Sequence, residues 1–209
     1  AIPPNHYIYL DTTAYYPCFI LRADTTVNDT QRVVGYQFLA SFYDPFFTAR
    51  LRFRYFSQNS ADIRNIVDIP AAEIPGGAPA ESGWHKMKVK AVGNQFWLYW
   101  DDQEIAGSPF TDEHPSARSD GYFGVYTWNA FSIGQSYDAL TKVDDILVKG
   151  NEYRESFTDG NLSLDWFSAW TDSVGNELTP MAASNETGPA DDWIGTVTGD
   201  KNSLVSLGA

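Results

Sequence analysis

Two neighbouring segments of the sequence alternate charged or aromatic side chains with apolar ones, and this arrangement can build a sugar-binding surface. Lysines occupy every second position of residues 86–90, and Trp97 and Tyr99 are separated by a single residue. Aromatic rings offer flat apolar area for stacking, and ammonium groups donate hydrogen bonds. The same pattern is typical of lysine stems that lie over exposed rings and only shield them from water. Both interpretations are open, and the sequence favours the second.

The dipeptide Gly93-Asn94 between these segments predicts a two-residue hairpin turn, which fixes the register of the two strands. Successive side chains of a strand point to opposite faces, so one set of pairs must face the core and the other water. The inward pairs are Ala91 with Phe96, Val89 with Leu98 and Met87 with Trp100, and the outward pairs are Lys90 with Trp97, Lys88 with Tyr99 and Lys86 with Asp101. Each outward pair is expected to contribute about 0.2–1 kcal/mol.

A second group of cations lies in residues 50–54, where arginines alternate with apolar residues. This period of two predicts that the apolar residues face the core and the arginines face water. Guanidinium groups bind carboxylates in a bidentate manner, so the arginines are candidate contacts to acidic sugars. Together with two further rings, the candidate carbohydrate-binding residues are Trp97, Tyr99, Tyr126, Trp128, Arg50, Arg52 and Arg54.

Composition limits the class of protein and its partners. The 209 residues suit one domain with an appendage, and contents of 43% hydrophobic and 15% aromatic residues can fill its core. A net charge of −13 repels a phosphate backbone, which argues against nucleic acid as a partner. No run approaches 18 apolar residues, so no membrane span is expected.

Turn residues interrupt the chain at short intervals and no long segment has helical periodicity, which predicts an all-β protein. The expected strands cover residues 7–10, 18–23, 33–43, 47–57, 62–69, 84–92, 96–101, 122–128 and 142–148. Residues 70–83, which are rich in Pro and Gly, are expected to form a loop. Alternation predicts a core that includes Phe53, Tyr55, Met87, Val89, Leu98, Trp100, Phe123, Val125, Ile146 and Val148.

Several of these strands carry motifs that follow one another in a recognisable order. They are Ser82-Gly83-Trp84-His85, Phe96-Trp97-Leu98-Tyr99-Trp100-Asp101, Gly121-Tyr122-Phe123-Gly124-Val125 and Val143-Asp144-Asp145-Ile146-Leu147-Val148. In this order they resemble the second half of a concanavalin A-like (laminin-G-like) β-sandwich, and the resemblance covers roughly residues 5–150. It implies an antiparallel jelly-roll β-sandwich in an extracellular, secreted protein, similar to non-catalytic carbohydrate-binding modules.

Residues 151–209 do not fit a finished sandwich of this kind. The run Phe157-Thr158-Asp159-Gly160-Asn161-Leu162 resembles the opening of such a domain, although it lies near the end of this chain. The domain is then circularly permuted, or the segment completes a neighbouring copy, or the chain is cut from a tandem array, or the segment is an extension wrapped on residues 1–150. These alternatives are open, and each gives a sandwich in residues 1–150 with a strand-bearing segment in residues 151–209.

The C-terminal segment is too apolar for a free tail, so its large side chains must be buried in this chain or in a neighbouring one. The residues expected to take part are Phe157, Leu162, Trp166, Phe167, Trp170 and Trp193. Completion between copies is head-to-tail, and such contacts propagate into a fibre or array unless they close a ring. The first functional hypothesis is therefore a self-assembling structural or interaction module. The second is a carbohydrate-binding module, and the third a glycan hydrolase or lyase.

Catalytic patterns are not evident in the sequence. A family 16 glycoside hydrolase, on the fold that the chain resembles, carries Glu-x-Asp-x-x-Glu on one strand, and that spacing does not occur here. The histidines His6, His85 and His114 are scattered, and no His-Glu-x-x-His motif is present. We therefore expect no catalytic residues, and a structural role for His85.

The resemblance implies a structural calcium ion. In many concanavalin A-like domains this ion lies between the acidic turn of the first strand and an Asp on the last strand. The matching positions here are Asp159 with the Gly160 carbonyl, and Asp144 or Asp145. Calcium prefers six to eight oxygen ligands, which carboxylates and carbonyls supply. The alternative is that Asp144 and Asp145 are surface charges that protect an edge strand from aggregation.

Further features bear on the compartment. The single cysteine, Cys18, excludes an internal disulfide, which is neutral as to the compartment. Asn28, Asn161 and Asn185 begin glycosylation sequons, which agrees with a secreted glycoprotein.

Overall fold

The computed structural model describes the strands and several of the segments that connect them. The described residues are 5–11, 17–24, 34–42, 48–57, 63–80, 83–128, 139–148, 153–155, 166–168, 181–184, 194–199 and 202–207. Side chains are described in residues 18–23, 34–42, 48–57, 63–80, 83–121 and 123–125.

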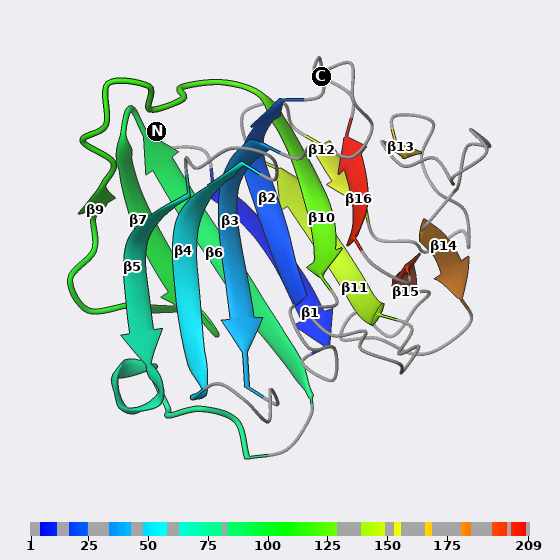
Figure 1. Ribbon diagram of the computed structural model, residues 1–209. Coiled ribbons are helices and arrows are strands. Elements are labelled where there is room, and N and C mark those ends of the chain that lie inside the picture. Colours follow the sequence, from blue (N-terminus) through cyan, green and yellow to red (C-terminus); the bar gives the residue numbers. More distant parts are fainter. Residues whose placement is uncertain are drawn as a thin grey trace, which may run out of the picture.

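The described strands form two antiparallel sheets, shown in Figure 1. Sheet A has the order β14 (Met181–Ser184), β15 (Ile194–Gly199), β11 (Ala139–Val148), β1 (Asn5–Asp11), β6 (Trp84–Val92), β7 (Gln95–Trp100) and β8 (Gln103–Glu104), with β12 (Tyr153–Glu155) beside β11 and β9 (Phe110–Thr111) beside β7. Sheet B has the order β13 (Trp166–Ser168), β16 (Asn202–Leu207), β10 (Tyr122–Trp128), β2 (Pro17–Asp24), β3 (Val34–Ser41), β4 (Arg50–Ser57) and β5 (Arg64–Pro70). The helix found among the described residues is a single 3-10 turn, η1 (Ala71–Glu73), so the predicted all-β class is confirmed.

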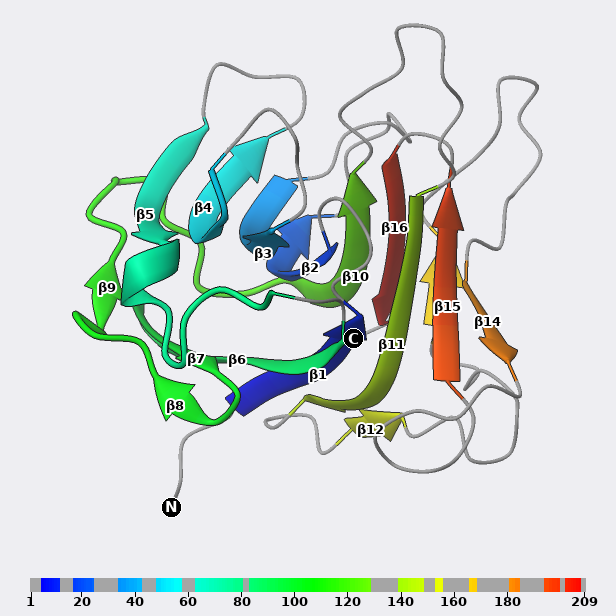
Figure 2. The same ribbon diagram turned by 90° about the horizontal axis from the view of Figure 1, so that it is seen from below.

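The core lies between the facing surfaces of the two sheets (Figure 2). The ring of Phe96 in sheet A is 4.7 Å from that of Tyr36 and 4.8 Å from that of Phe53, both in sheet B. The predicted core residues Phe53, Tyr55, Met87, Val89, Leu98, Trp100, Phe123 and Val125 are all buried. The other two, Ile146 and Val148, lie on β11, where only the backbone is described.

The predicted hairpin register is confirmed. Residues of β6 and β7 pair as Met87 with Trp100, Lys88 with Tyr99, Val89 with Leu98, Lys90 with Trp97 and Ala91 with Phe96. Gly93 has a φ of +57°, which glycine adopts without a steric cost and which a two-residue hairpin turn requires.

The prediction that β7 extends to Asp101 is wrong. Asp101 and Asp102 have φ angles of 47° and 63°, and they form the turn between β7 and β8. Aspartate tolerates this left-handed region better than most residues, and two consecutive positive φ angles are what a tight hairpin turn of this kind requires. The outward pair predicted for Lys86 changes as a result, because its ammonium group contacts Asp102 instead of Asp101.

The strands of residues 151–209 extend both sheets of their own chain at one end (Figures 1 and 2). In sheet A, β12 and β15 pair with β11, and in sheet B, β16 pairs with β10. The strands β15 and β16 also contact each other, so this end of the molecule joins the two sheets. Trp166 and Phe167 lie on β13, and Phe157, Leu162, Trp170 and Trp193 lie outside the described residues.

Among the described residues, no helix has the length and the hydrophobicity that crossing a membrane requires.

Candidate functional site

The outer face of sheet A carries a ladder of lysines and aromatic rings, here called the lysine–ring ladder: Lys86, Lys88, Lys90, Trp97 and Tyr99. These residues alternate with buried residues of β6 and β7, so they lie on the face opposite the core. The Lys88 ammonium lies 4.0 Å from the centre of the Tyr99 ring, and the Lys90 ammonium 4.2 Å from that of Trp97. The cation–ring pairs predicted from the register are thus present.

Two carboxylates flank one end of the ladder. Asp102 forms an ion pair with Lys86 at 3.0 Å and a longer one with Lys88 at 3.7 Å. Partial burial, together with a hydrogen bond to Glu104, raises the pKa of the Tyr99 hydroxyl. In the part of the chain that the structure describes, no carboxylate lies within ion-pair distance of Lys90. The cationic character of the ladder therefore grows from Lys86 toward Lys90.

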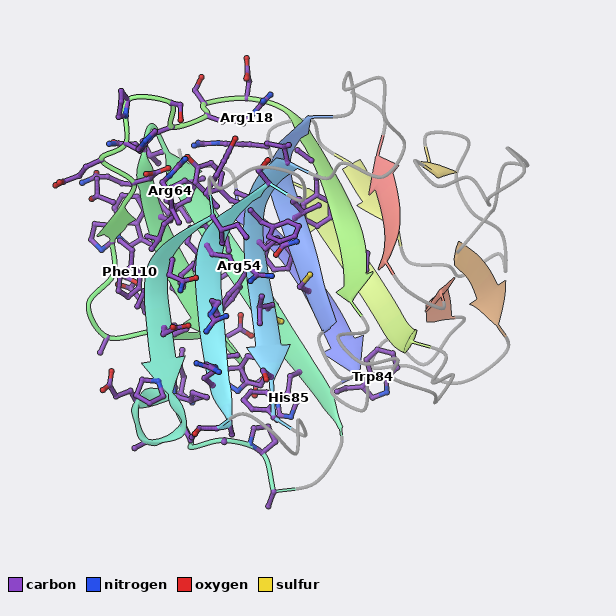
Figure 3. The ribbon with its side chains drawn as sticks, viewed as in Figure 1. Arg54, Arg64, Trp84, His85, Phe110 and Arg118 are labelled. Carbon is purple, nitrogen blue, oxygen red and sulfur yellow. The ribbon has the colours of Figure 1, made fainter. Side chains whose placement is uncertain are left out.

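His85 lies next to the ladder but on the inner side of β6. Its ring stacks on Trp100 at 4.6 Å, and its Nδ1 lies 2.8 Å from the Asp101 carboxylate. Burial opposes ionisation of Asp101, but the hydrogen bonds from His85 and from the Lys86 amide outweigh it and lower the pKa of this carboxyl group. Figure 3 shows His85 at one end of the sheets, and its ring stacks there on the buried Trp100. This position supports the structural role expected for it.

The outer face of sheet B is named here the arginine face: Arg50, Arg52 and Arg54 on β4, with their neighbours on β2 and β3. The prediction that these arginines face water is wrong for Arg54, which is only 5% exposed. Its Nε donates a hydrogen bond to Gln37 Oε1 at 2.9 Å, and its guanidinium lies 4.7 Å from the centre of the Phe56 ring. Arg52 donates from both Nε and Nη2 to Asp68.

The strands beside the arginines explain this burial. Register places Gln37 and Ile20 in one row with Arg54, and Leu39 and Cys18 in one row with Arg52. These four neighbours are at most 4% exposed, and Ser41 is 2% exposed. Burial raises the pKa of the Cys18 thiol, although nearby Arg54 opposes that effect. The arginine face is therefore interior around Arg54 and its neighbours on β2 and β3, whereas the Arg52 side chain is 21% exposed.

The predicted carbohydrate-binding residues divide between two sheets. Trp97 and Tyr99 lie on the outer face of sheet A, and the arginines lie on that of sheet B. Tyr126 and Trp128 belong to β10 in sheet B, where Tyr126 pairs with Cys18, and their side chains lie outside the described part. The structure thus does not bring these seven residues together into one site.

A buried polar network, absent from the sequence predictions, lies at the end of the sheets opposite His85 (Figure 3). Tyr36 donates to Asp112 Oδ2 at 2.8 Å, and Arg64 Nη2 donates to the same oxygen at 3.0 Å. Burial, followed by the hydrogen bond to Asp112, raises the pKa of Tyr36 to about 12. Burial opposes ionisation of Asp112, but its hydrogen bonds from Arg64 and Tyr36 dominate and lower its pKa.

Arg22 connects this network to the hairpin of sheet A. Its Nη1 donates to the carbonyls of Gly93 at 2.6 Å and Arg118 at 2.7 Å, and its guanidinium lies 5.1 Å from the centre of the Phe96 ring. Its φ is 53°, which a long side chain adopts only under constraint. The available sequence signal was a lone arginine in the apolar run Phe19-Ile20-Leu21-Arg22-Ala23. The bond to the Gly93 carbonyl fixes the position of the Gly93-Asn94 turn, which joins the two strands of the ladder.

Most of the residues expected to bind calcium or to carry glycans lie outside the described part of the chain. Asp144 and Asp145 lie on β11, where Asp144 pairs with Tyr9 in backbone register, and Asp159 and Gly160 lie outside the described residues. Among the side chains that the structure describes, no three His, Cys, Asp or Glu residues are grouped for a metal ion. Asn28, Asn161 and Asn185 also lie outside the described residues.

The chain was compared with known proteins. No protein-family model matches it, and no curated protein matches it significantly. The resemblance to concanavalin A-like domains therefore rests on the strand motifs of residues 82–148.

Proposed function

We propose that this chain is a non-catalytic, extracellular carbohydrate-binding module of the concanavalin A-like β-sandwich kind, which binds sugar on the lysine–ring ladder. The observation that supports this proposal is the pair of half-buried rings, Trp97 and Tyr99, each flanked by a lysine ammonium on the outer face of sheet A. Two sheets that share one core, in the strand order of the quoted motifs, support the sandwich assignment.

The spacing of the rings suits a sugar chain. Residues two apart on a strand are separated by about 6.8 Å, so neighbouring sugar units can each meet one ring. The lysines supply hydrogen-bond donors beside the rings. The ladder is also rigid, because the opposite side of the same strands carries fully buried Met87, Val89 and Leu98. Sites built on strands hold their geometry better than sites on loops.

Retention on immobilised polysaccharides tests this proposal. Trp97→Ala should abolish or strongly reduce retention of the protein, because a flat ring supplies much of the contact area at low entropic cost. Ile63→Ala, at an exposed apolar residue that immediately precedes β5 of the other sheet, is the matched control and should leave retention unchanged. Failure of the unmodified protein to bind any member of a broad glycan panel would refute the proposal.

A second candidate function is assembly through residues 151–209, and the pairing of β15 and β16 favours it. In sheet A, β15 pairs with β11, and in sheet B, β16 pairs with β10, so the segment adds a strand to each sheet. A segment that covers both sheets of its own chain can make the same contacts with a neighbouring copy, as in domain swapping. Head-to-tail exchange of this kind would give a fibre or array.

Molar mass in solution tests the assembly proposal. Light scattering coupled to size exclusion should show species whose mass grows with protein concentration. A version ending at residue 150 should no longer show this growth in mass and should be poorly soluble. Adding residues 151–209 as a separate peptide should restore its solubility. A full-length protein that remains monomeric at high concentration would contradict it.

A further inference from the structure

The lysine–ring ladder is rich in cations, although the chain as a whole is acidic. The chain has 27 acidic and 14 basic residues, yet the outward positions of β6 carry Lys86, Lys88 and Lys90 in succession. Lys86 is paired with Asp102 at 3.0 Å, Lys88 lies on the Tyr99 ring and 3.7 Å from Asp102, and Lys90 lies on the Trp97 ring. The ladder is therefore a local cationic surface on an acidic molecule.

Lys88 and Lys90 each lie on an aromatic ring, and a bound anion would interact with their ammonium groups more strongly than the rings do. The side chain of Lys88 is 18% exposed, and its ammonium lies 4.0 Å from the centre of the Tyr99 ring and 3.7 Å from the Asp102 carboxylate. A contact between a cation and a ring is weaker than a charge-assisted hydrogen bond to a carboxylate. A carboxylate that approaches the ladder would therefore draw the ammonium away from the ring face. The face of Trp97 or Tyr99 then becomes free to stack on the ligand.

We propose that the ligand of the ladder is a polysaccharide whose sugar units carry carboxylates, that is, a polyuronate. Lys88 and Lys90 bind the carboxylates, and Trp97 and Tyr99 stack on the sugar rings from which the lysines have moved. This inference rests on the proposed carbohydrate-binding function and adds the chemical class of the sugar. The ladder offers a polyanion a local cationic surface, although the net charge of the chain is −13.

Affinity electrophoresis or calorimetry with three probes tests the inference. The probes are polygalacturonate, which has sugar rings and carboxylates, dextran, which has rings alone, and polyglutamate, which has carboxylates alone. The protein should bind polygalacturonate at least about tenfold more tightly than either of the others. Binding should weaken as salt increases from 0.05 to 0.5 M, because exposed charges are then screened.

Variants assign the two contributions. Lys88→Gln and Lys90→Gln keep most of the side-chain stem, and each should weaken binding of polygalacturonate about tenfold, the effect of one charge-assisted hydrogen bond. Trp97→Ala should weaken it at least as much. Ile63→Ala, at a 49% exposed residue that immediately precedes β5 of sheet B, is the control and should change nothing. Melting temperatures close to that of the unmodified protein would show that each variant is folded.

Each contrary result has a distinct meaning. Binding of dextran as tight as that of polygalacturonate, with no effect of the lysine variants, would refute the polyuronate and leave the carbohydrate-binding function. Binding of polyglutamate as tight as that of polygalacturonate, with no effect of Trp97→Ala, would reduce the ladder to an ion exchanger and refute the inference. Binding of none of the probes or of any other glycan would refute both proposals.

Discussion

The two outer faces of the molecule carry the same pattern of sequence but have different surroundings. Lysines alternate with apolar residues in β6, and arginines alternate with apolar residues in β4. On sheet A the lysines lie over half-buried rings at the surface, whereas on sheet B Arg54 is 5% exposed and bonded to a fully buried Gln37. Alternation identifies the side that faces the core, but it does not establish that the other side faces water.

The burial of the neighbouring strands explains why the arginines and the lysines differ in exposure. In β3 every residue after Val34 is buried, on both faces of the strand. A run such as Tyr36-Gln37-Phe38-Leu39-Ala40 lacks the alternation of a half-exposed strand, and continuous burial is typical of a strand covered on both sides. On sheet A the neighbours of the lysines across the hairpin are themselves aromatic and only half-buried. Sequence analysis of a face should therefore include the adjacent strands.

The largest effect is expected inside the core that both sheets share. Leu98 is fully buried on β7, so Leu98→Ala should lower the free energy of unfolding by about 2–5 kcal/mol. Tyr99→Ala, one residue along the same strand but on the outer face, is the matched control and should cost much less. Urea denaturation measures both variants. Equal losses would mean that the outer face of sheet A is as interior as that of sheet B.

The next effect compares the two cationic faces directly. Arg54→Ala removes the donor to the buried Gln37 Oε1, and a buried polar group left without a partner costs about 1–3 kcal/mol in addition to the lost packing. Lys88→Ala on sheet A removes a surface contact and should cost less than about 1 kcal/mol. Urea denaturation of the two variants should rank them in this order. The reverse order would contradict the assignment of the arginine face as an interior surface.

A smaller effect is expected at the network that anchors the ladder. Tyr36→Phe removes a hydrogen bond to the charged Asp112, worth about 1.5–3 kcal/mol, while Arg64 still donates to that carboxylate. The pKa of Tyr36 is raised to about 12 from an unfolded value of about 10. A raised pKa stabilises the folded state below the unfolded value, and that contribution is lost as the pH rises from 10 to 12.

Stability measured between pH 8 and 12 checks this prediction. The unmodified protein should lose stability between pH 10 and 12 by more than the Tyr36→Phe variant does. Parallel curves for the two proteins would show that Tyr36 does not contribute to the alkaline transition. Tyr99→Phe, at the surface of the ladder, provides a comparison from a less buried hydroxyl.

Parts of the fold and of the site could be predicted from local sequence, and other parts could not. Gly93-Asn94 predicted the turn and the register, and the register predicted the cation–ring pairs. The contact of Tyr36 with Asp112 joins residues 76 positions apart, and no local pattern indicates such a pair. The turn at Asp101-Asp102 depends on positive φ angles that aspartate tolerates but does not require.

The smallest expected effect is the coupling free energy between Lys90 and Trp97, which sets how easily a ligand can displace the lysine from the ring. Lys90 and Trp97 should show a coupling of about 0.5–1 kcal/mol in a double-mutant cycle of Lys90→Gln and Trp97→Ala, as is usual for an exposed cation on a ring. The same cycle with Lys86→Gln, whose ammonium pairs with Asp102, should show almost no coupling with Trp97. A small coupling leaves the ring face available, because a ligand has to overcome only that much to displace the lysine. A coupling above about 2 kcal/mol, typical of a desolvated pair, would mean that the ladder is a closed structural surface like the arginine face.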